Sequence, residues 1–186
     1  MKVIFLDHDG VICLSSNWGG RSKKWAKYRS ANPESSRDMG QAPVEYRFDD
    51  FDKKAIKVLN EILEETGAEI VVSSDWRKHY TLRQMRDVMI EYGIYGPLID
   101  ITTHQNLWNR MSGPSLEWER ASQVVKWAKD NKISNWISID DLKLNQEYKW
   151  MKPRIPMWRH VQVDGDWGFG GRLRDKIDEC IAKLNK

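Results

Sequence analysis

Four acidic residues of the chain stand where they could bind a metal ion together. Asp7 and Asp9 follow the apolar run VIFL with one residue between them and Gly10 directly after, and Asp140 and Asp141 end a second run, WISI. Alternate residues of an extended chain face the same side, so Asp7 and Asp9 are expected to point toward one site. Carboxylates from two strands suit a hard divalent cation such as Mg²⁺. The spacing therefore predicts a metal-assisted site for an anionic ligand.

A third apolar run ends in hydroxyl groups. The stretch AEIVV is followed by Ser73 and Ser74, and Arg77 comes three residues later. In parallel α/β sheets, ligands bind beyond the carboxyl ends of the strands, so Ser73 is expected beside the acids. Ser74 and Arg77 are candidates for substrate contacts. The alternative for Ser73 is that its hydroxyl only caps the following turn.

Apolar periodicity predicts the elements that must position these residues. Helix 53–66 is expected to begin after Asp52 as its N-cap and to end at Gly67. Strands alternating with helices indicate βαβ units, so the predicted fold class is α/β with a mostly parallel sheet. The predicted strands are 2–7, 68–74, 98–103, 135–141 and 160–164. The other predicted helices are 81–93, 115–131 and 172–184.

Length and composition indicate one globular domain over residues 1–186. Charged residues make up 31% and hydrophobic residues 40% of the chain, which argues against a disordered tail. The net charge of +3 permits an anionic ligand without requiring nucleic acid. No apolar run approaches membrane-spanning length, and no leader pattern precedes the first strand, so we expect a cytoplasmic protein without a membrane association. Two cysteines, Cys13 and Cys180, fit a reducing compartment, and no obligate protein partner is evident.

The ordered stretches resemble the motifs of the haloacid dehalogenase (HAD) superfamily of phosphohydrolases. FLDHDGV is similar to its first motif, IVVSS to its second and ISIDD to its acidic fourth. VVSSDWR and WISIDD look most like the HAD domains of RNA-repair and phage proteins. The resemblance implies a Rossmann-like HAD core with a small cap-like insertion.

The resemblance also implies roles for the residues that match its motifs. Asp7 would be the nucleophile that forms an aspartyl-phosphate, and Asp9 would be the general acid and then the base. Ser73 would bind a phosphoryl oxygen. The metal set would be Asp7, the backbone carbonyl of Asp9, Asp140, and Asp141 directly or through water, with Mg²⁺ as the expected ion.

The third motif of the superfamily is a lone lysine or arginine, and two residues compete for it. Arg120 lies 20 positions before Asp140 and near the start of the predicted helix, whereas Lys126 lies 14 before it and in mid-helix. We favour Arg120, because its position leaves room for the helix, a loop and the strand. Its planar guanidinium also matches phosphate oxygens.

Residues 14–50 interrupt the pattern and form the candidate insertion. Between residues 14 and 47 this segment carries seven basic and three acidic side chains, interleaved with Trp18, Trp25, Tyr28 and Tyr46. A second stretch, YKWMKPRIPMWRH (148–160), has no acid. Cations with exposed aromatics suit a phosphate backbone and stacked bases, and Lys24 and Trp25 are the candidate contacts. The alternative is a solvated basic surface.

These observations predict a Mg²⁺-dependent phosphomonoesterase with a phosphorylated substrate. The expected substrate is a nucleic-acid end, as for a polynucleotide 3′-phosphatase, or a nucleotide. A free nucleoside-monophosphate or small-metabolite phosphatase is the first alternative, and a non-catalytic phosphate- or RNA-binding module is the second. The Asp7–Asp9 pair argues against the second, because a binding module needs no nucleophile and acid together. The glycine-rich loop 164–171 is expected at the rim of the site.

Overall fold

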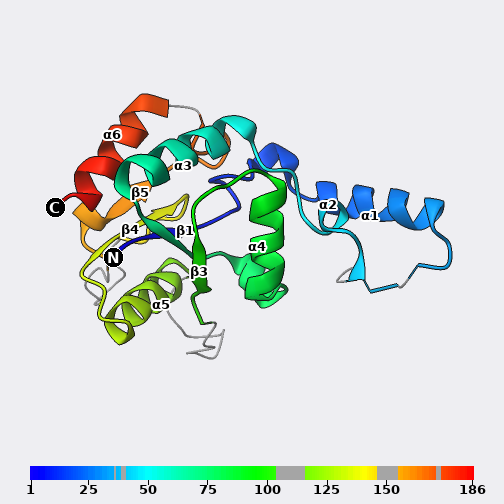
Figure 1. Cartoon of the computed structure of the whole chain (residues 1–186), viewed down its shortest axis with the longest axis horizontal. Coiled ribbons are helices and arrows are strands. Elements are labelled where there is room, and N and C mark those ends of the chain that lie inside the picture. The colour runs from blue at the N-terminus through cyan, green and yellow to red at the C-terminus, as the bar shows by residue number, and fades with distance from the viewer. Residues whose placement is uncertain (36, 39–40, 104–115, 146–154, 171–172) are drawn as a thin grey trace.

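The strands of the protein form one all-parallel sheet in the order β3-β2-β1-β4-β5 (Figure 1). The computed structural model describes residues 1–35, 37–38, 41–103, 116–145, 155–170 and 173–186. The strand bounds are β1 (Lys2–Leu6), β2 (Glu69–Val72), β3 (Leu98–Ile101), β4 (Asn135–Asp140) and β5 (His160–Gln162). The α/β prediction is confirmed, as is each predicted strand within a few residues of its ends.

Helices cover both faces of this sheet. Ile4 and Leu6 of β1 pack in one hydrophobic core with residues of α3, α4 and α6, whereas Val3 and Phe5 pack with α5 in a second core. This alternation is what a buried strand requires, because successive side chains leave opposite faces. The helix bounds are α3 (Lys53–Thr66), α4 (Leu82–Glu91), α5 (Leu116–Asp130) and α6 (Leu173–Leu184).

The predicted boundaries of α3 are confirmed by its capping contacts. The side chain of Asp52 accepts a hydrogen bond from the backbone N–H of Ala55 at 2.8 Å. Gly67 ends the helix with φ 63°, a left-handed conformation that glycine adopts without steric penalty, and its N–H donates to the carbonyl of Leu63. These contacts place the start of β2 two residues later.

Helix α1 (Gly20–Ala31) was not predicted from the sequence. None of its residues is buried, so it has no apolar stripe and gives no helical periodicity. Figure 1 shows α1 projecting away from the sheet, with α2 (Val44–Arg47) at its side. A short 3₁₀ turn, η1 (Ser15–Asn17), precedes α1. The division of the chain into a core and the insertion 14–50 stays a prediction.

The structure bears on three further features of the sequence: the two cysteines, the apolar length of the helices, and the second basic stretch (148–160). Cys13 and Cys180 are free and buried. No helix in the described ranges has the length and apolar character needed to span a membrane. Residues 148–154 of the second basic stretch and Gly171 of the glycine-rich loop lie outside the described residues.

Candidate active site

Three carboxylates meet where β1 and β4 end. These strands pair in parallel, with Leu6 opposite Ile139, so Asp7 and Asp140 emerge side by side. One carboxylate oxygen from each of Asp7, Asp140 and Asp141 lies within 4.8 Å of the other two. Burial, followed by repulsion from Asp7, raises the pKa of Asp140 well above its usual range, and the same two causes raise that of Asp141. A cluster of oxygen ligands that repel one another fits a hard divalent cation.

Arg120 supplies the positive charge that this cluster needs. The side chain leaves the first turns of α5, is only 4% exposed, and donates to Asp7 and, at 3.0 Å, to Asp140. A further oxygen, Oδ1 of Asp75, lies 3.4 Å from its guanidinium. Burial alone would lower the pKa of Arg120, but Asp7 and Asp140 raise it well above its usual value. The guanidinium is therefore charged at every working pH.

Lys126 lies apart from the carboxylate cluster. Its side chain is half exposed and forms an ion pair with Asp130 at 2.5 Å, one turn further along α5. The structure thus brings Arg120, and not Lys126, to the carboxylates. This placement agrees with the choice that spacing favoured, although the role of either residue stays a prediction.

Strand β2 brings Ser73 to the other side of Asp7. The backbone N–H of Ser73 donates to the carbonyl of Leu6 at 2.9 Å. The hydroxyl oxygen of Ser73 is buried and has no hydrogen-bond partner within the described part of the chain. Leaving a buried polar group unpaired is unfavourable by about 1–3 kcal/mol, so this hydroxyl is well placed to bind an oxygen of a ligand.

Ser74 has a local partner instead. Its side chain accepts a hydrogen bond from the backbone N–H of Trp76 at 3.4 Å and caps the 3₁₀ turn η3 (Asp75–Lys78). Capping, which the sequence analysis considered for Ser73, is thus made by Ser74. Its predicted contact with substrate stays a prediction.

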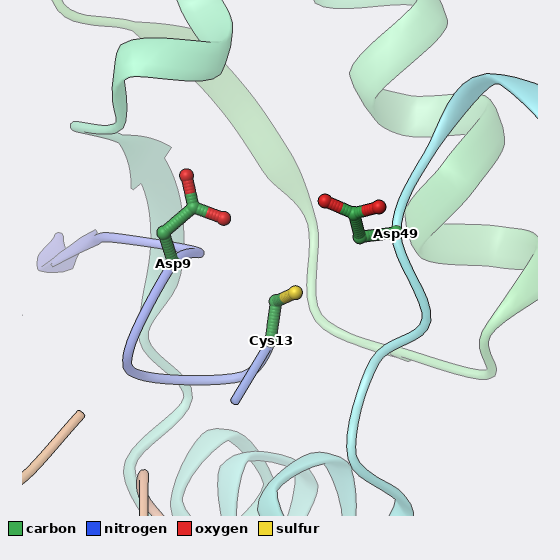
Figure 2. Close-up of side chains that lie close together, drawn as sticks. All are labelled: Asp9, Cys13 and Asp49. Atoms are coloured by element: carbon green, nitrogen blue, oxygen red, sulfur yellow. The ribbon is translucent and has the colours of Figure 1, made fainter. Parts of the chain in front are cut away.

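Asp9 lies in a neighbouring cluster and not among the three carboxylates. Strand β1 ends at Leu6, so the alternation of side chains does not extend to Asp9. Figure 2 shows its carboxylate facing Asp49 and Cys13, and one ligand atom of each lies within 4.8 Å of the others. The indole N–H of Trp76 donates to Oδ2 of Asp9 at 2.9 Å.

The surroundings of Asp9 favour its protonated form. Burial, with repulsion from Asp7 as the next cause, raises the pKa of Asp9 to about 6, and the hydrogen bond from Trp76 opposes this rise. A carboxyl group that titrates near neutral pH can both donate and accept a proton. This is the property that a general acid and base requires.

Gly10 allows the two clusters to approach each other. Its φ is 74°, which is strained for any residue with a side chain, and an added Cβ would collide with the carboxylate of Asp141. A glycine directly after Asp9 therefore lets the chain turn and lets Asp141 reach the site.

Comparison with known proteins identifies the family to which the chain belongs. The model of the HAD domain in Swiss Army Knife RNA repair proteins matches residues 3–171. The chain belongs to this HAD family. Neither the curated proteins nor the solved structures that were searched include a match. Membership confirms the resemblance noted from the motifs, supports a phosphatase-like activity, and agrees with a divalent metal ion, which HAD proteins usually use.

Within this HAD domain, His8 is a packing residue. Its ring is fully buried and lies 4.9 Å from the ring of Trp76 and 5.5 Å from that of Phe51. Burial, and then the charge of Arg120, lowers the pKa of His8 to about 3. The imidazole is therefore neutral near neutral pH.

Arg77 lies near the carboxylate cluster of the HAD domain but is held by other residues. Its guanidinium donates to the carbonyl of Ser74 at 2.7 Å and to the side chain of Gln123 on α5. Burial and the charge of Arg120 lower its pKa. Arg77 thus forms a second, partly buried cation beside Arg120, and its contact with substrate stays a prediction.

Lys24 and Trp25 lie on α1, apart from the carboxylates. The ammonium group of Lys24 pairs with Asp50 at 2.8 Å, and the ring of Trp25 stacks on Tyr28 with centroids 5.7 Å apart. Both side chains therefore have intramolecular partners on or next to α1.

Sequence reasoning missed Trp76 and Asp49. Asp49 accepts hydrogen bonds from the backbone N–H groups of Gly19 at 3.2 Å and Arg21 at 2.6 Å, so it holds the first turn of α1 beside Asp9. The pair of acids at 49–50 within a basic segment was a usable signal for Asp49. No local pattern distinguishes Trp76, because its partner Asp9 lies 67 residues earlier.

Proposed function

We propose that this HAD domain is a Mg²⁺-dependent phosphomonoesterase that acts through an aspartyl-phosphate. The observation that supports it most is the convergence of Asp7, Arg120 and Ser73 at one edge of the sheet. These groups supply a nucleophile, a fixed positive charge and a hydroxyl within one buried site. Phosphoryl transfer depends mainly on such positioning and charge stabilisation.

In the first half-reaction, an oxygen of Asp7 attacks phosphorus while the bond to the leaving oxygen breaks. Asp9 gives its proton to that leaving oxygen, so an alcohol departs and the phosphoryl group stays on Asp7. Asp9 then takes a proton from water, which attacks phosphorus and restores the Asp7 carboxylate. The guanidinium of Arg120 and the hydroxyl of Ser73 bind the phosphoryl oxygens throughout.

The carboxylates of Asp7, Asp140 and Asp141 would hold the Mg²⁺ ion. All three donors are oxygens. Burial, and then repulsion from Asp7, raises the pKa of Asp140 and of Asp141, and a bound cation would relieve this repulsion. When bound there, the ion would shield the charge of the phosphate from the attacking carboxylate. The backbone carbonyl of Asp9 is the further ligand that the motif implies.

A phosphate-release assay tests this proposal. The panel contains nucleoside monophosphates, 3′- and 5′-phosphorylated oligonucleotides and sugar phosphates, each with Mg²⁺ and with a chelator. We expect release that requires Mg²⁺ and is fastest with a nucleotide or an oligonucleotide end. Absence of turnover with every substrate would favour the phosphate- or RNA-binding module, and preference for a sugar phosphate would favour the metabolite phosphatase.

The protonation of Asp9 should control the pH dependence with poor leaving groups. Asp9 carries its proton below its pKa of about 6 and loses it above, so kcat/KM for an alkyl phosphate should fall as the pH rises through this value. Replacing Asp9 by asparagine should slow alkyl phosphates by about 10²–10⁴-fold and activated aryl phosphates much less. Equal losses for both substrates would contradict the general-acid role.

A matched pair of tryptophan variants distinguishes the titration of Asp9 from the titration of the substrate's own phosphate group. Trp76→Phe removes the N–H that lowers the pKa of Asp9, so the fall in kcat/KM should move to higher pH. Trp127→Phe removes a comparable hydrogen bond, to Asp100 at 2.6 Å, and should leave the pH profile unchanged. Identical profiles for the two variants would count against Asp9 as the titrating group.

Helix α1 supports a nucleic-acid end as the substrate. Its twelve residues include five cations and no acid, and none of them is buried. Lys23 and Lys27 are exposed, whereas Lys24 is paired with Asp50. A projecting cationic helix attached beside Asp9 suits the phosphates that follow a terminal nucleotide. The free cysteines fit the reducing cytoplasm in which we place the protein.

The cations of α1 should act on affinity and not on the chemical step. Replacing Lys23, Lys24 and Lys27 together by glutamine should raise KM for a phosphorylated oligonucleotide and lower the slope of log KM against log salt by about 0.7 for each lost phosphate contact. Turnover of a small aryl phosphate should not change. The measurement is a salt series with both substrates.

The control is a matched triple variant on the face of the sheet that α5 covers. Lys126 and Lys129 lie in the last turns of α5, and Lys132 follows two residues after its end. Lys126 is paired with Asp130 as Lys24 is with Asp50. Their replacement by glutamine should leave the salt slope unchanged. If the α1 variant binds the oligonucleotide as the wild type does, α1 is a solvated surface.

A further inference from the structure

Two exposed tryptophans lie on loops that are bound to each other beside the carboxylate cluster. Trp18 is 52% exposed and Trp167 is 70% exposed. The backbone N–H and the hydroxyl of Ser15 donate to the carbonyl of Gly165 at 3.1 Å and 2.9 Å. These contacts hold the segments 14–18 and 164–168 together.

Gly165 brings this pair of loops to the mouth of the site. A Cβ at Gly165 would lie 3.1 Å from Oδ2 of Asp141 and 3.7 Å from Cα of Gly10. Trp167 follows Gly165 by two residues, so their Cα atoms are at most about 8 Å apart. Trp18 follows Ser15 by three residues, and its N–H donates to the carbonyl of Ser15 at 3.2 Å. Both tryptophans therefore lie on loops at the rim of the carboxylate site.

The backbone of this rim is fixed, so the indoles are presented by ordered loops. The N–H of Phe169 donates to the carbonyl of Val11 at 2.9 Å, and that of Trp167 donates to Asp164 at 3.2 Å. A Cβ at Gly168 would collide with the side chain of Leu14. An exposed indole on an ordered loop offers a flat face that stacks on any nucleobase.

We propose that Trp18 and Trp167 form a base-binding rim, on which the nucleobase next to the reacting phosphate stacks. The inference rests on the proposed phosphatase function and names the part of the substrate that lies outside the phosphate site. A nucleotide carries its base one sugar away from its phosphate, so the base lies outside the phosphate site when the phosphate is bound in it. The same rim would serve a free nucleotide and the last nucleotide of a strand.

The test compares a nucleoside 5′-monophosphate with ribose 5-phosphate, which carries the same phosphate and sugar without a base. In the variant with both Trp18→Ala and Trp167→Ala, KM for the nucleotide should rise at least about tenfold with kcat unchanged. KM for ribose 5-phosphate should not change. Phenylalanine at both positions should restore most of the affinity, because it keeps a stacking face. If the preferred substrate is a strand end, KM for a phosphorylated oligonucleotide should be lower than KM for the free nucleotide.

The control is Trp158→Ala. Trp158 is 43% exposed, but it lies before the first residue of β5, at the edge opposite the carboxylates, and the guanidinium of Arg159 covers its ring at 4.1 Å. This variant should leave both KM values unchanged. An unchanged nucleotide KM in the double variant would overturn the inference, and would leave a protein partner as the remaining reason for the exposed rings.

A binding measurement keeps this inference separate from the proposed function. Titration of the wild type with the nucleoside 5′-monophosphate should quench tryptophan fluorescence, and the double variant should lose this quenching. Quenching that needs Trp18 and Trp167 without any phosphate release would uphold the rim and refute the phosphatase. Phosphate release with equal KM for the nucleotide and for ribose 5-phosphate would uphold the phosphatase and refute the base-binding rim.

Discussion

Replacing Asp7 by asparagine should abolish phosphate release while the protein stays folded. The amide cannot attack phosphorus as the carboxylate does, and loss of a nucleophile lowers kcat by on the order of 10⁴-fold or more. Asparagine keeps the oxygen that accepts the backbone N–H of His8 at 2.7 Å. It also removes the repulsion between Asp7 and Asp140. The fold should therefore survive, and thermal unfolding beside the phosphate-release assay measures both outcomes.

The matched control is Asp166→Asn, on the rim of the same site. Asp166 is exposed in the loop that carries Trp167, and the same chemical change there should leave kcat unaltered. A folded Asp7→Asn variant with near wild-type turnover would remove Asp7 as the nucleophile, whatever the behaviour of the metal.

Replacing Arg120 by alanine should reduce both turnover and stability. Loss of one positioned charge at a transferring group lowers kcat by about 10²–10³-fold. The variant also leaves the buried carboxylates of Asp7 and Asp140 without their counter-charge, which lowers the free energy of unfolding by about 3–5 kcal/mol. Steady-state kinetics and urea unfolding measure the two losses separately.

Two further variants make the result for Arg120 decisive. Arg120→Lys keeps the charge within the fold but loses the planar fork, so it should fold and still lose turnover. Lys126→Ala, on the same helix, removes only an exposed ion pair with Asp130 and should change neither quantity by more than about 1 kcal/mol. If Lys126→Ala caused the larger loss of turnover, the third motif would belong to Lys126.

The strand ends could be predicted because each is marked by local composition. VIFL, EIVV and WISI are short, mostly apolar runs of the kind that buried strands carry, and Asp7, Ser73 and Asp140 are the polar residues that end them. Helix α3 was equally well marked by Asp52 and Gly67, whose cap contacts involve neighbours in the chain. Helix α1 has no such marks, because a helix without a buried face leaves no periodicity to detect.

Local pattern thus determines the elements and the residues at their ends, since a strand or helix is selected by neighbours within a few positions. It does not determine which element lies beside which. The order β2-β1-β4 brings Ser73, Asp7 and Asp140 together, and the packing of α5 against that sheet adds Arg120. Asp9 depends still more on packing, because its partners Trp76 and Asp49 are 67 and 40 residues away in the chain, and only the folded chain brings an indole N–H and a second carboxylate to it.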